Sequence, residues 1–363
     1  MRIIKLSTVL LVTTAWMVFA VSPKTKRSGG PLSLDHSSLH VTELQGTVLS
    51  ESDLFALPTA IAVVEDHLVL VDRFGEHVVH VLSRATGEIM DSFGRHGEGP
   101  GEFKVAYSID PVPGEEPVFW IFDAGLQRLT CVRLHDADRR ERPWESPILE
   151  LHARGTVTNP VWVSDDALIS LGFFLEGRLA KLDAAGNVTA MLGSLPEADR
   201  EVPPNVLLHA YQGTMKPSPD RSRLAVVTRH AGFVEIYGAG GELVNRTGGP
   251  FPFEPRFEVK PGPEGPVMGS GRDLRFGYLD VATTGDRIYA LFSGRTREGF
   301  PGRANYGEYV HLFNWSGEFE GALRLDAEAI AIAVDAEKRR LYAVRHLPQP
   351  GVLAYRLPAA GRL

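Results

Sequence analysis

The sequence predicts an all-β fold, a six-bladed β-propeller with four-stranded antiparallel blades. Three observations support this prediction. Short apolar strands alternate with turn residues along almost the whole chain, one phrase of strand, turn and strand occurs six times, and the copies lie roughly 50 residues apart. A repeat of about 40–50 residues that carries four strands is typical of a propeller.

Each copy of the repeated phrase has the composition of a β-hairpin. Its strands are rich in Val, Ile, Leu and aromatic residues, and its turn holds Asp, Gly, Pro, Ser or a charged pair. The copies are TAIAVVEDHLVLVD (59–72), YSIDPVPGEEPVFWIFD (107–123), NPVWVSDDALISLG (159–172), GTMKPSPDRSRLAVVTRH (213–230), LDVATTGDRIYALFSG (279–294) and AIAIAVDAEKRRLYAVRH (329–346). A third, alternating strand follows each copy, and in most copies a glycine-containing turn and a fourth strand come next. Each copy therefore predicts one blade.

The last copy has only three strands before the chain ends, whereas LHVTELQGTVLS (39–50) precedes the first copy without a partner. We expect residues 39–50 to form the outer, fourth strand of the last blade, because this pairing removes two exposed sheet edges. The propeller is then one domain over 39–357, since no blade buries its faces without its neighbours. Residues 21–38 are expected to be a linker and residues 358–363 a tail.

Residues 1–20 are predicted to be a secretory signal peptide. Arg2 and Lys5 precede an apolar run over 6–20 that ends in small residues, which is the order of a signal sequence. The run is short for a membrane-spanning helix, which needs about 20 residues. An uncleaved anchor is the alternative, because basic residues follow the run directly. We therefore expect an exported protein that is periplasmic, envelope-associated or secreted, with no other membrane contact.

Composition and charge exclude several classes of protein. The hydrophobic content of 44% and the charged content of 23% are those of a folded globular chain. The net charge of −7 argues against a nucleic-acid binder, whose affinity depends on neutralising phosphates. Cys131 is the only cysteine, so an internal disulfide and a cysteine-built zinc site are both excluded.

The glycine-rich stretch FGRHGEGPGEF (93–103) lies between the first and second predicted blades. It matches no phosphate-binding glycine pattern and leads into a strand, so we interpret it as an inter-blade crossover in which glycines permit positive φ. GRHGEGPGEF resembles the G-x-x-G-x-GPGEF stretch of exported bacterial six-bladed propellers, which are relatives of the NHL-repeat and TolB-like propellers. The C-terminal third, with YVHLFNWSGEFEGALRLD (309–326), is similar to that family as well. The resemblance implies a six-bladed propeller outside the cytoplasm and implies no reaction.

Two sets of polar residues are candidate ligand groups. The first set follows the second strand of several blades, where the turns emerge on one face and basic groups would attract an anion by their summed potential. It comprises Asp72, Arg73, Asp123, Arg229, His230, Arg295, Arg345 and His346. The second set lies at or near the start of the inner strands, which line the channel of a propeller, and converging polar groups there are the default ligand site. It comprises Thr59, Tyr107, Asn159, His209, Tyr211, Lys216 and Tyr278.

For both sets the alternative is a structural role, as ordinary solvated turn charge or as groups that hydrate a narrow channel. No catalytic set is recognisable, because the histidines are scattered and neither H-E-x-x-H nor a carboxylate-rich calcium loop occurs. The inner strands offer Asn159 and Asp110 but no clear acidic set. No particular cofactor or oligomeric state is indicated.

The leading hypothesis for function is an exported, non-enzymatic binding or scaffold propeller. It would present its channel mouth or a blade face to a protein, peptide or carbohydrate ligand, and no nucleic acid is expected as a partner. The alternative is a metal-dependent lactonase-like, esterase-like or lyase-like hydrolytic enzyme. A third hypothesis is an anion-binding sensor domain that uses the basic rim.

Overall fold

The computed structural model describes residues 33–113, 117–134, 147–196, 201–263 and 265–359. The predicted signal peptide and most of the predicted linker lie outside these residues. Among the described residues, none of the helices combines the length and the apolar character that crossing a membrane requires.

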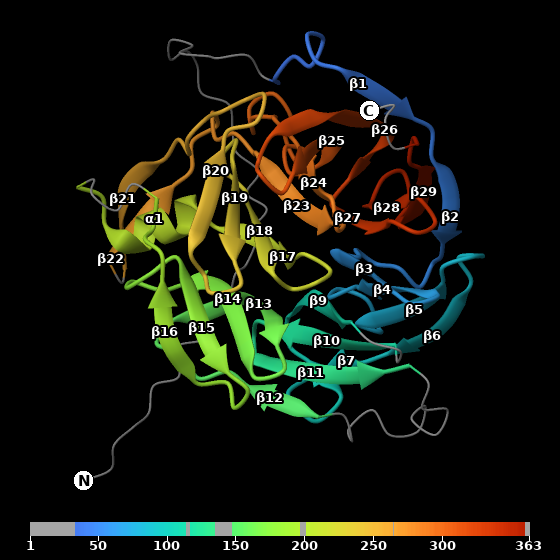
Figure 1. The fold of residues 1–363 in the computed structure, drawn as a ribbon, viewed down its shortest axis with the longest axis horizontal. Coiled ribbons are helices and arrows are strands. Elements are labelled where there is room, and N and C mark those ends of the chain that lie inside the picture. The colour runs from blue at the N-terminus through green and yellow to red at the C-terminus, as the bar shows by residue number, and fades with distance from the viewer. Residues whose placement is uncertain (1–32, 114–116, 135–146, 197–200, 264, 360–363) are drawn as a thin grey trace. The chain divides into compact units, whose positions relative to one another are not determined.

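Six antiparallel sheets are arranged in a ring with their first strands innermost, which confirms the predicted fold class (Figure 1). Blade 1 consists of β3 (Ala60–Val64), β4 (His67–Val71), β5 (Val79–Ser83) and β6 (Ile89–Phe93). Blade 2 consists of β9 (Ala106–Val112), β10 (Val118–Asp123), β11 (Arg128–Arg133) and β12 (Ile148–Glu150). Blade 3 consists of β13 (Thr156–Ser164), β14 (Ala167–Phe173), β15 (Leu179–Asp183) and β16 (Val188–Leu192). Blade 4 consists of β17 (Gly213–Pro217), β18 (Arg223–Thr228), β19 (Val234–Gly238) and β20 (Leu243–Thr247). Blade 5 contains β23 (Tyr278–Thr283), β24 (Arg287–Phe292), β25 (Gly307–Asn314) and β26 (Phe319–Ala329). Blade 6 contains β27 (Ala331–Asp335), β28 (Arg340–Arg345) and β29 (Gly351–Arg356).

The N-terminal segment closes the ring in a different way from the prediction. Strand β2 (Thr47–Glu51) pairs antiparallel with β29 and completes blade 6, as expected. Strand β1 (Val41–Leu44) instead runs parallel to β26 and adds a fifth strand to blade 5. The assignment of all of residues 39–50 to the last blade was therefore wrong. The long outer strand β26 pairs with both β25 and β1, so one segment covers the edges of two blades.

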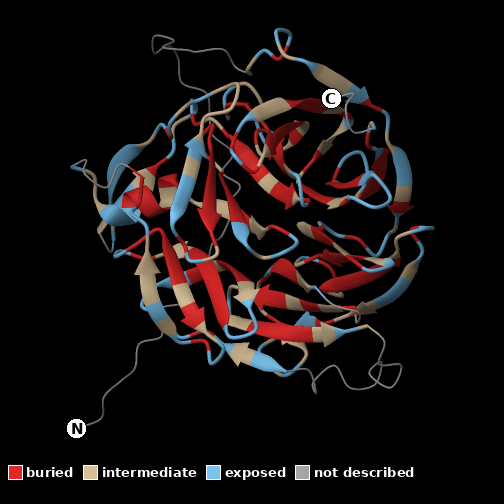
Figure 2. Cartoon of the chain, in the orientation of Figure 1, coloured by how far each residue is buried: buried red, intermediate tan, exposed pale blue. Residues whose placement is uncertain are grey.

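The hydrophobic core lies between neighbouring blades rather than within single blades. The second and third strands of the blades are mostly buried, whereas the outer strands expose much of their length (Figure 2). One cluster joins Ile61 of blade 1 to Tyr342 of blade 6, and another joins Val161 of blade 3 to Tyr237 of blade 4. Each blade therefore depends on its neighbours for burial, as expected of a repeat protein.

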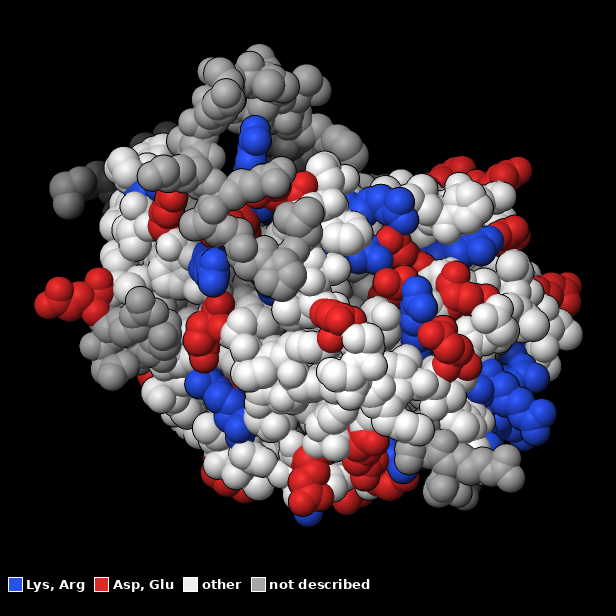
Figure 3. Space-filling view, turned by 90° about the horizontal axis from the view of Figure 1, so that it is seen from above, with Lys and Arg blue, Asp and Glu red and all other residues white. Residues whose placement is uncertain are grey.

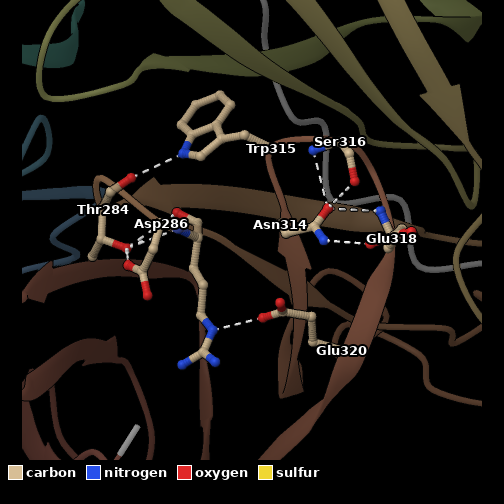
Figure 4. A network of polar contacts seen from close by, with 8 residues as sticks. Thr284, Asp286, Asn314, Trp315, Ser316, Glu318 and Glu320 are labelled. Atoms are coloured by element: carbon tan, nitrogen blue, oxygen red, sulfur yellow. Dashed lines mark hydrogen bonds and ion pairs between the residues drawn. The ribbon is translucent and has the colours of Figure 1, made fainter. Parts of the chain in front are cut away.

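The NWSGE turn between β25 and β26 shows how a local sequence determines a blade corner (Figure 4). The Asn314 side-chain oxygen accepts hydrogen bonds from the backbone N–H groups of Ser316 and Glu318, both at 3.0 Å. Gly317 takes the positive φ of 89° that the turn requires. The buried Trp315 indole donates to the Thr284 carbonyl at 3.0 Å and fastens this turn to the hairpin between β23 and β24.

The FGRHGEGPGEF stretch is an ordered crossover between β6 and β9. Its two short strands, β7 (Arg95–His96) and β8 (Glu102–Phe103), form a parallel ladder, and Gly94 and Gly101 have φ of 79° and 73°. The Glu102 carboxylate accepts the Gly99 N–H at 3.0 Å. Arg128 donates to the carbonyls of Gly99 and Glu102 at 3.0 and 2.6 Å. These contacts hold the loop to blade 2, so the stretch has a structural role.

A short helix and an extra hairpin stand beside the blades. The helix α1 (Pro204–Ala210) precedes blade 4, and the hairpin of β21 (Glu258–Gly262) and β22 (Gly265–Gly269) lies in the segment between blades 4 and 5. Leu207 and Leu208 of the helix pack in one apolar cluster with Met268 of β22. With seven residues, α1 is too short to show a helical period in the sequence.

Candidate functional site

The two aspartates of the first candidate set hold backbone amides. The Asp72 carboxylate accepts the N–H groups of Ala56 and Leu57 at 2.6 and 3.0 Å. Asp123 does the same for Lys104 and Val105, also at 2.6 and 3.0 Å. In both blades the second strand thereby holds the loop that leads into the inner strand. Such side-chain to backbone bonds are typical of aspartate at loop positions.

Two of the candidate arginines are paired inside the structure. Arg295 forms ion pairs with Glu328 and, at 3.5 Å, with Glu308, and its side chain is only 7% exposed. Arg345 pairs with Glu51 on β2 and so fastens the N-terminal strand to blade 6. Neither guanidinium is left without a carboxylate.

Both candidate histidines on the second-to-third-strand turns are buried. His346 contacts the Pro58 carbonyl through Nε2 at 2.7 Å and the Tyr306 hydroxyl through Nδ1 at 2.9 Å. Burial lowers the pKa of His230 to about 3, helped by the positive charges of Arg229 and Arg297. His230 is therefore neutral and contributes no positive charge to the face.

His209 and Tyr211 belong to the connection around α1 instead of the channel. The His209 ring lies 4.7 Å from the ring of Phe173, and burial lowers its pKa. The fully buried Tyr211 donates its hydroxyl hydrogen to Glu254 at 2.9 Å. Tyr278 also lies in the core, where its hydroxyl contacts His311. The expectation that Tyr211 and Tyr278 face the channel was wrong, because their rings pack between strands and connections.

Asn159 belongs to a set of inner-strand side chains that join neighbouring blades. Each accepts a backbone N–H from the inner strand of the next blade: Asp110 from Trp162 at 2.9 Å, Asn159 from Met215, and Asp280 from Ile332 at 2.9 Å. Sequence reasoning missed Asp280, although it occupies an inner strand just as Asp110 does. Among the described residues, no group of three or more His, Cys, Asp or Glu side chains is placed to hold a metal ion.

Among the described residues, Arg73 and Arg229 are the candidates that form no ion pair. Arg73 lies over the Phe74 ring, 5.0 Å from its centroid, and the charge of Arg229 acts on the more distant Asp280. They follow β4 of blade 1 and β18 of blade 4, which are opposite each other in a ring of six. Burial lowers the pKa of Arg73, and the positive charge of Arg229 lowers it further. The interaction with Tyr107 raises the same pKa. The positive charge of Arg229 therefore acts on Arg73 from the opposite blade, and Nε of Arg73 is buried without an acceptor among the described residues.

Arg297 is the third cation near this end of the channel. Burial and the positive charge of Arg229 lower its pKa, and it donates to the Ser270 hydroxyl at 2.8 Å. Exposed apolar side chains lie at the same ends of the blades: Phe74, which is 56% exposed, Leu57 and Leu347 in loops, and Tyr107 near the start of the inner strand β9. We call Arg73, Arg229 and Arg297, together with Phe74 and Tyr107, the arginine mouth.

The arginine mouth differs from the side of the molecule. On the side drawn in Figure 3, basic and acidic side chains are interspersed around a broad neutral area. Exposed pairs such as Arg324 with Glu43, at 3.3 Å, contribute little to binding or stability. A net positive potential is instead expected where cations converge without carboxylates.

Comparison with known proteins places the fold in a broad group. A family model described as TolB-like 6-blade propeller-like matches residues 38–337. Among solved structures, a Bacteroides fragilis protein described as a "Putative exported protein" aligns with a TM-score of 0.54 at 11% identity, covering 89% of this chain and 100% of its own. The β-propeller domain of Cps50 (Swd1) from Myceliophteria thermophila aligns with a TM-score of 0.48 at 12% identity, covering 86% and 100%. No curated protein matches this sequence.

Proposed function

Because this chain belongs to the TolB-like six-bladed propeller family, and because such a fold serves many functions, we propose a function from its site. The protein is an exported, non-enzymatic binding propeller. Its arginine mouth binds the carboxylates of a peptide segment presented by a partner protein.

The observation that carries the proposal is that the guanidinium groups of Arg73 and Arg229 form no ion pair with a carboxylate of the described residues. Partly burying a cation without a partner is unfavourable, and a bound anion removes that penalty. The planar fork of arginine suits carboxylates, which it can bind through two parallel hydrogen bonds. A carboxylate between blades 1 and 4 would contact both side chains.

The exposed apolar side chains indicate what lies beside the carboxylate. Phe74 and Tyr107 offer large, rigid contact surfaces at the arginine mouth, and aromatic and arginine side chains dominate the energetics of many interfaces. A peptide that alternates acidic and large apolar side chains satisfies both kinds of contact. This chemistry favours a peptide over a neutral carbohydrate.

Export is the second part of the proposal. Its support is the charged, apolar and small-residue order of residues 1–20, which is that of a secretory signal. The Bacteroides fragilis protein with a similar fold is also assigned as exported.

Binding of a fluorescein-labelled hexapeptide with two glutamates between leucines tests the proposed site. We expect Arg73→Gln and Arg229→Gln each to weaken binding about 10-fold or more, because each removes a charge-assisted hydrogen bond. Fluorescence anisotropy titrations measure the dissociation constants. A peptide with glutamines in place of the glutamates should bind much more weakly to the unaltered protein.

The matched control is Arg356→Gln, which changes an exposed arginine at the end of β29 that lies away from the second-to-third-strand turns. This variant should bind the acidic peptide as the unaltered protein does. Equal binding by Arg73→Gln, Arg229→Gln and Arg356→Gln would disprove the site.

No specific observation favours the hydrolytic alternative. The two polar side chains that it could draw from the inner strands, Asn159 and Asp110, each accept a backbone N–H of the next blade. Their evident role is to hold inner strands in register. We therefore propose binding and no reaction.

A further inference from the structure

A cavity of about 320 Å³ lies at the opposite end of the inner strands from the arginine mouth. It is formed by residues of the inner strands β3, β9, β17, β23 and β27, mostly beyond the first residues of each strand, and by turns that follow some of these strands. Its volume falls in the range of small-molecule sites, which begins at about 300 Å³. The proposed function does not use this cavity.

Blade 3 contributes no residue to the cavity wall, because side chains of blade 4 reach across it to blade 2. Arg221, in the turn after β17, donates to Asp110 at 2.8 Å and to the Trp162 carbonyl at 2.8 Å. The backbone of Arg221 has a φ of +60°, the left-handed region that is unfavourable for a side chain of this size. This bridge closes one side of the cavity.

Lys216 supplies the cavity with hydrogen-bond donors that have no acceptor. Its ammonium group also reaches across to blade 2 and donates to the Ile109 carbonyl at 2.8 Å. An ammonium group has three donors, and the described residues provide an acceptor for only this one. Two N–H donors therefore remain for a molecule that enters the cavity.

The rest of the wall carries the polar side chains of Glu65, Asp110, Ser218, Arg221 and Thr283 and is otherwise formed by aliphatic residues and prolines. Ile61 and Val63 face it from blade 1, Val112 from blade 2, and Ile332 and Val334 from blade 6. A positive group with free donors at an apolar wall suits a ligand with one acidic end and a hydrocarbon body. We propose that this cavity binds a small monocarboxylate, with its carboxylate on Lys216 Nζ and its hydrocarbon chain against the aliphatic side chains.

The charges around Lys216 predict that binding takes up a proton. Burial lowers the pKa of Lys216, whereas the negative charges of Asp280 and Asp110 raise it. With Lys216 protonated, it and Arg221 balance the two negative charges of Asp110 and Asp280 in the empty cavity. Burial raises the pKa of Asp280 to about 6, against the charges of Lys216 and Arg229 and the N–H groups of Ile332 and Val281. A bound carboxylate raises this pKa further, so Asp280 takes a proton from solvent.

Calorimetric titration with octanoate tests the proposal. We expect Lys216→Met to weaken octanoate binding at least 10-fold, and the control Lys338→Met, at an exposed lysine, to leave it unchanged. We also expect 1-octanol, which has the same body without the charge, to bind at least 10-fold more weakly than octanoate. Equal affinity for octanoate in Lys216→Met, or equal affinity for 1-octanol, contradicts the proposal.

Two further variants keep the test decisive if Lys216→Met folds poorly. Val63→Trp fills the cavity from its aliphatic wall and should abolish octanoate binding, whereas unchanged binding places the ligand elsewhere.

Calorimetry in buffers of different ionisation enthalpy measures the proton uptake. At pH 7 the unaltered protein should take up close to one proton for each octanoate bound, and Asp280→Asn should take up close to none. Arg73→Gln should bind octanoate normally, so failure here is distinguishable from failure of the arginine mouth.

Discussion

Replacing Arg178 with methionine is expected to destabilise the propeller by about 3–5 kcal/mol. Arg178 lies in the second-to-third-strand turn of blade 3 and contacts Glu235 on β19 of blade 4 at 3.1 Å. The two side chains are only 3% and 1% exposed. Removing the arginine leaves a buried carboxylate whose remaining basic partner among the described residues is the partly exposed Arg246, at 2.9 Å.

The same guanidinium group also satisfies neutral acceptors between the blades. It donates to the Tyr211 carbonyl at 2.6 Å and to the Thr228 hydroxyl at 3.4 Å. Methionine fills a similar volume but leaves these acceptors without a donor, which adds to the loss. Arg178 therefore joins blade 3, the connection around α1 and blade 4.

Equilibrium denaturation in urea measures this effect. The double variant Arg178→Met/Glu235→Gln should recover part of the lost free energy of unfolding, because the buried carboxylate is replaced by a neutral amide and Arg246, which loses its partner, is partly exposed. The control Arg324→Met breaks an exposed pair with Glu43, whose side chains are 43% and 60% exposed, and should cost about 1 kcal/mol or less. A loss below about 1 kcal/mol for Arg178→Met itself would contradict the assigned role.

The second large effect is a loss of stability in mild acid. Burial lowers the pKa of His36 from 6.5 to about 4 and that of His230 from 6.5 to about 3. As the pH falls below 6.5, the unfolded chain binds these protons and the folded chain does not, so stability falls with pH. Asp280 acts in the opposite sense, because its raised pKa of about 6 lets the folded chain bind a proton first.

The contacts of His36 explain why it resists protonation. Its Nε2 lies 3.0 Å from Nε2 of His311, its Nδ1 lies 3.2 Å from the Leu34 carbonyl, and its ring stacks on Tyr309 at 3.6 Å. Neutral rings satisfy every contact if Tyr278 donates to His311, His311 to His36, and His36 to Leu34. A further proton on either ring would lack an acceptor, and burial also lowers the pKa of His311.

Thermal unfolding at pH 7.5 and pH 4.5 measures this effect. We expect the melting temperature to fall by about 5 °C or more, because several buried histidines outweigh Asp280. The double variant His36→Phe/His311→Phe should show a smaller fall. A melting temperature that is equal or higher at pH 4.5 would show that the buried histidines do not control acid stability.

The fold was predictable because its signals are local and repeated. Alternating apolar residues and turn residues mark each hairpin, and six copies at a constant spacing predict six blades. The position of β1 was not predictable in this way, since its parallel pairing with β26 depends on how the closed ring places two distant segments. Asp326 takes part in that placement by accepting the Gly46 N–H at 3.2 Å.

The candidate site was only partly predictable. Positions after the second strand of each blade do lie at one end of the ring, but their partners come from other blades. Glu51 pairs with Arg345, and Glu328 with Arg295, from positions that no local pattern connects. The opposition of Arg73 and Arg229 could have been deduced, because their copies stand three repeats apart in a ring of six.

A crystal structure of the protein with the acidic hexapeptide tests the central claim most directly. The arginine mouth predicts a glutamate carboxylate within hydrogen-bond distance of both Arg73 and Arg229, with a leucine against Phe74 or Tyr107. A peptide bound to an outer strand, or to the cavity at the other end of the inner strands, would contradict the account.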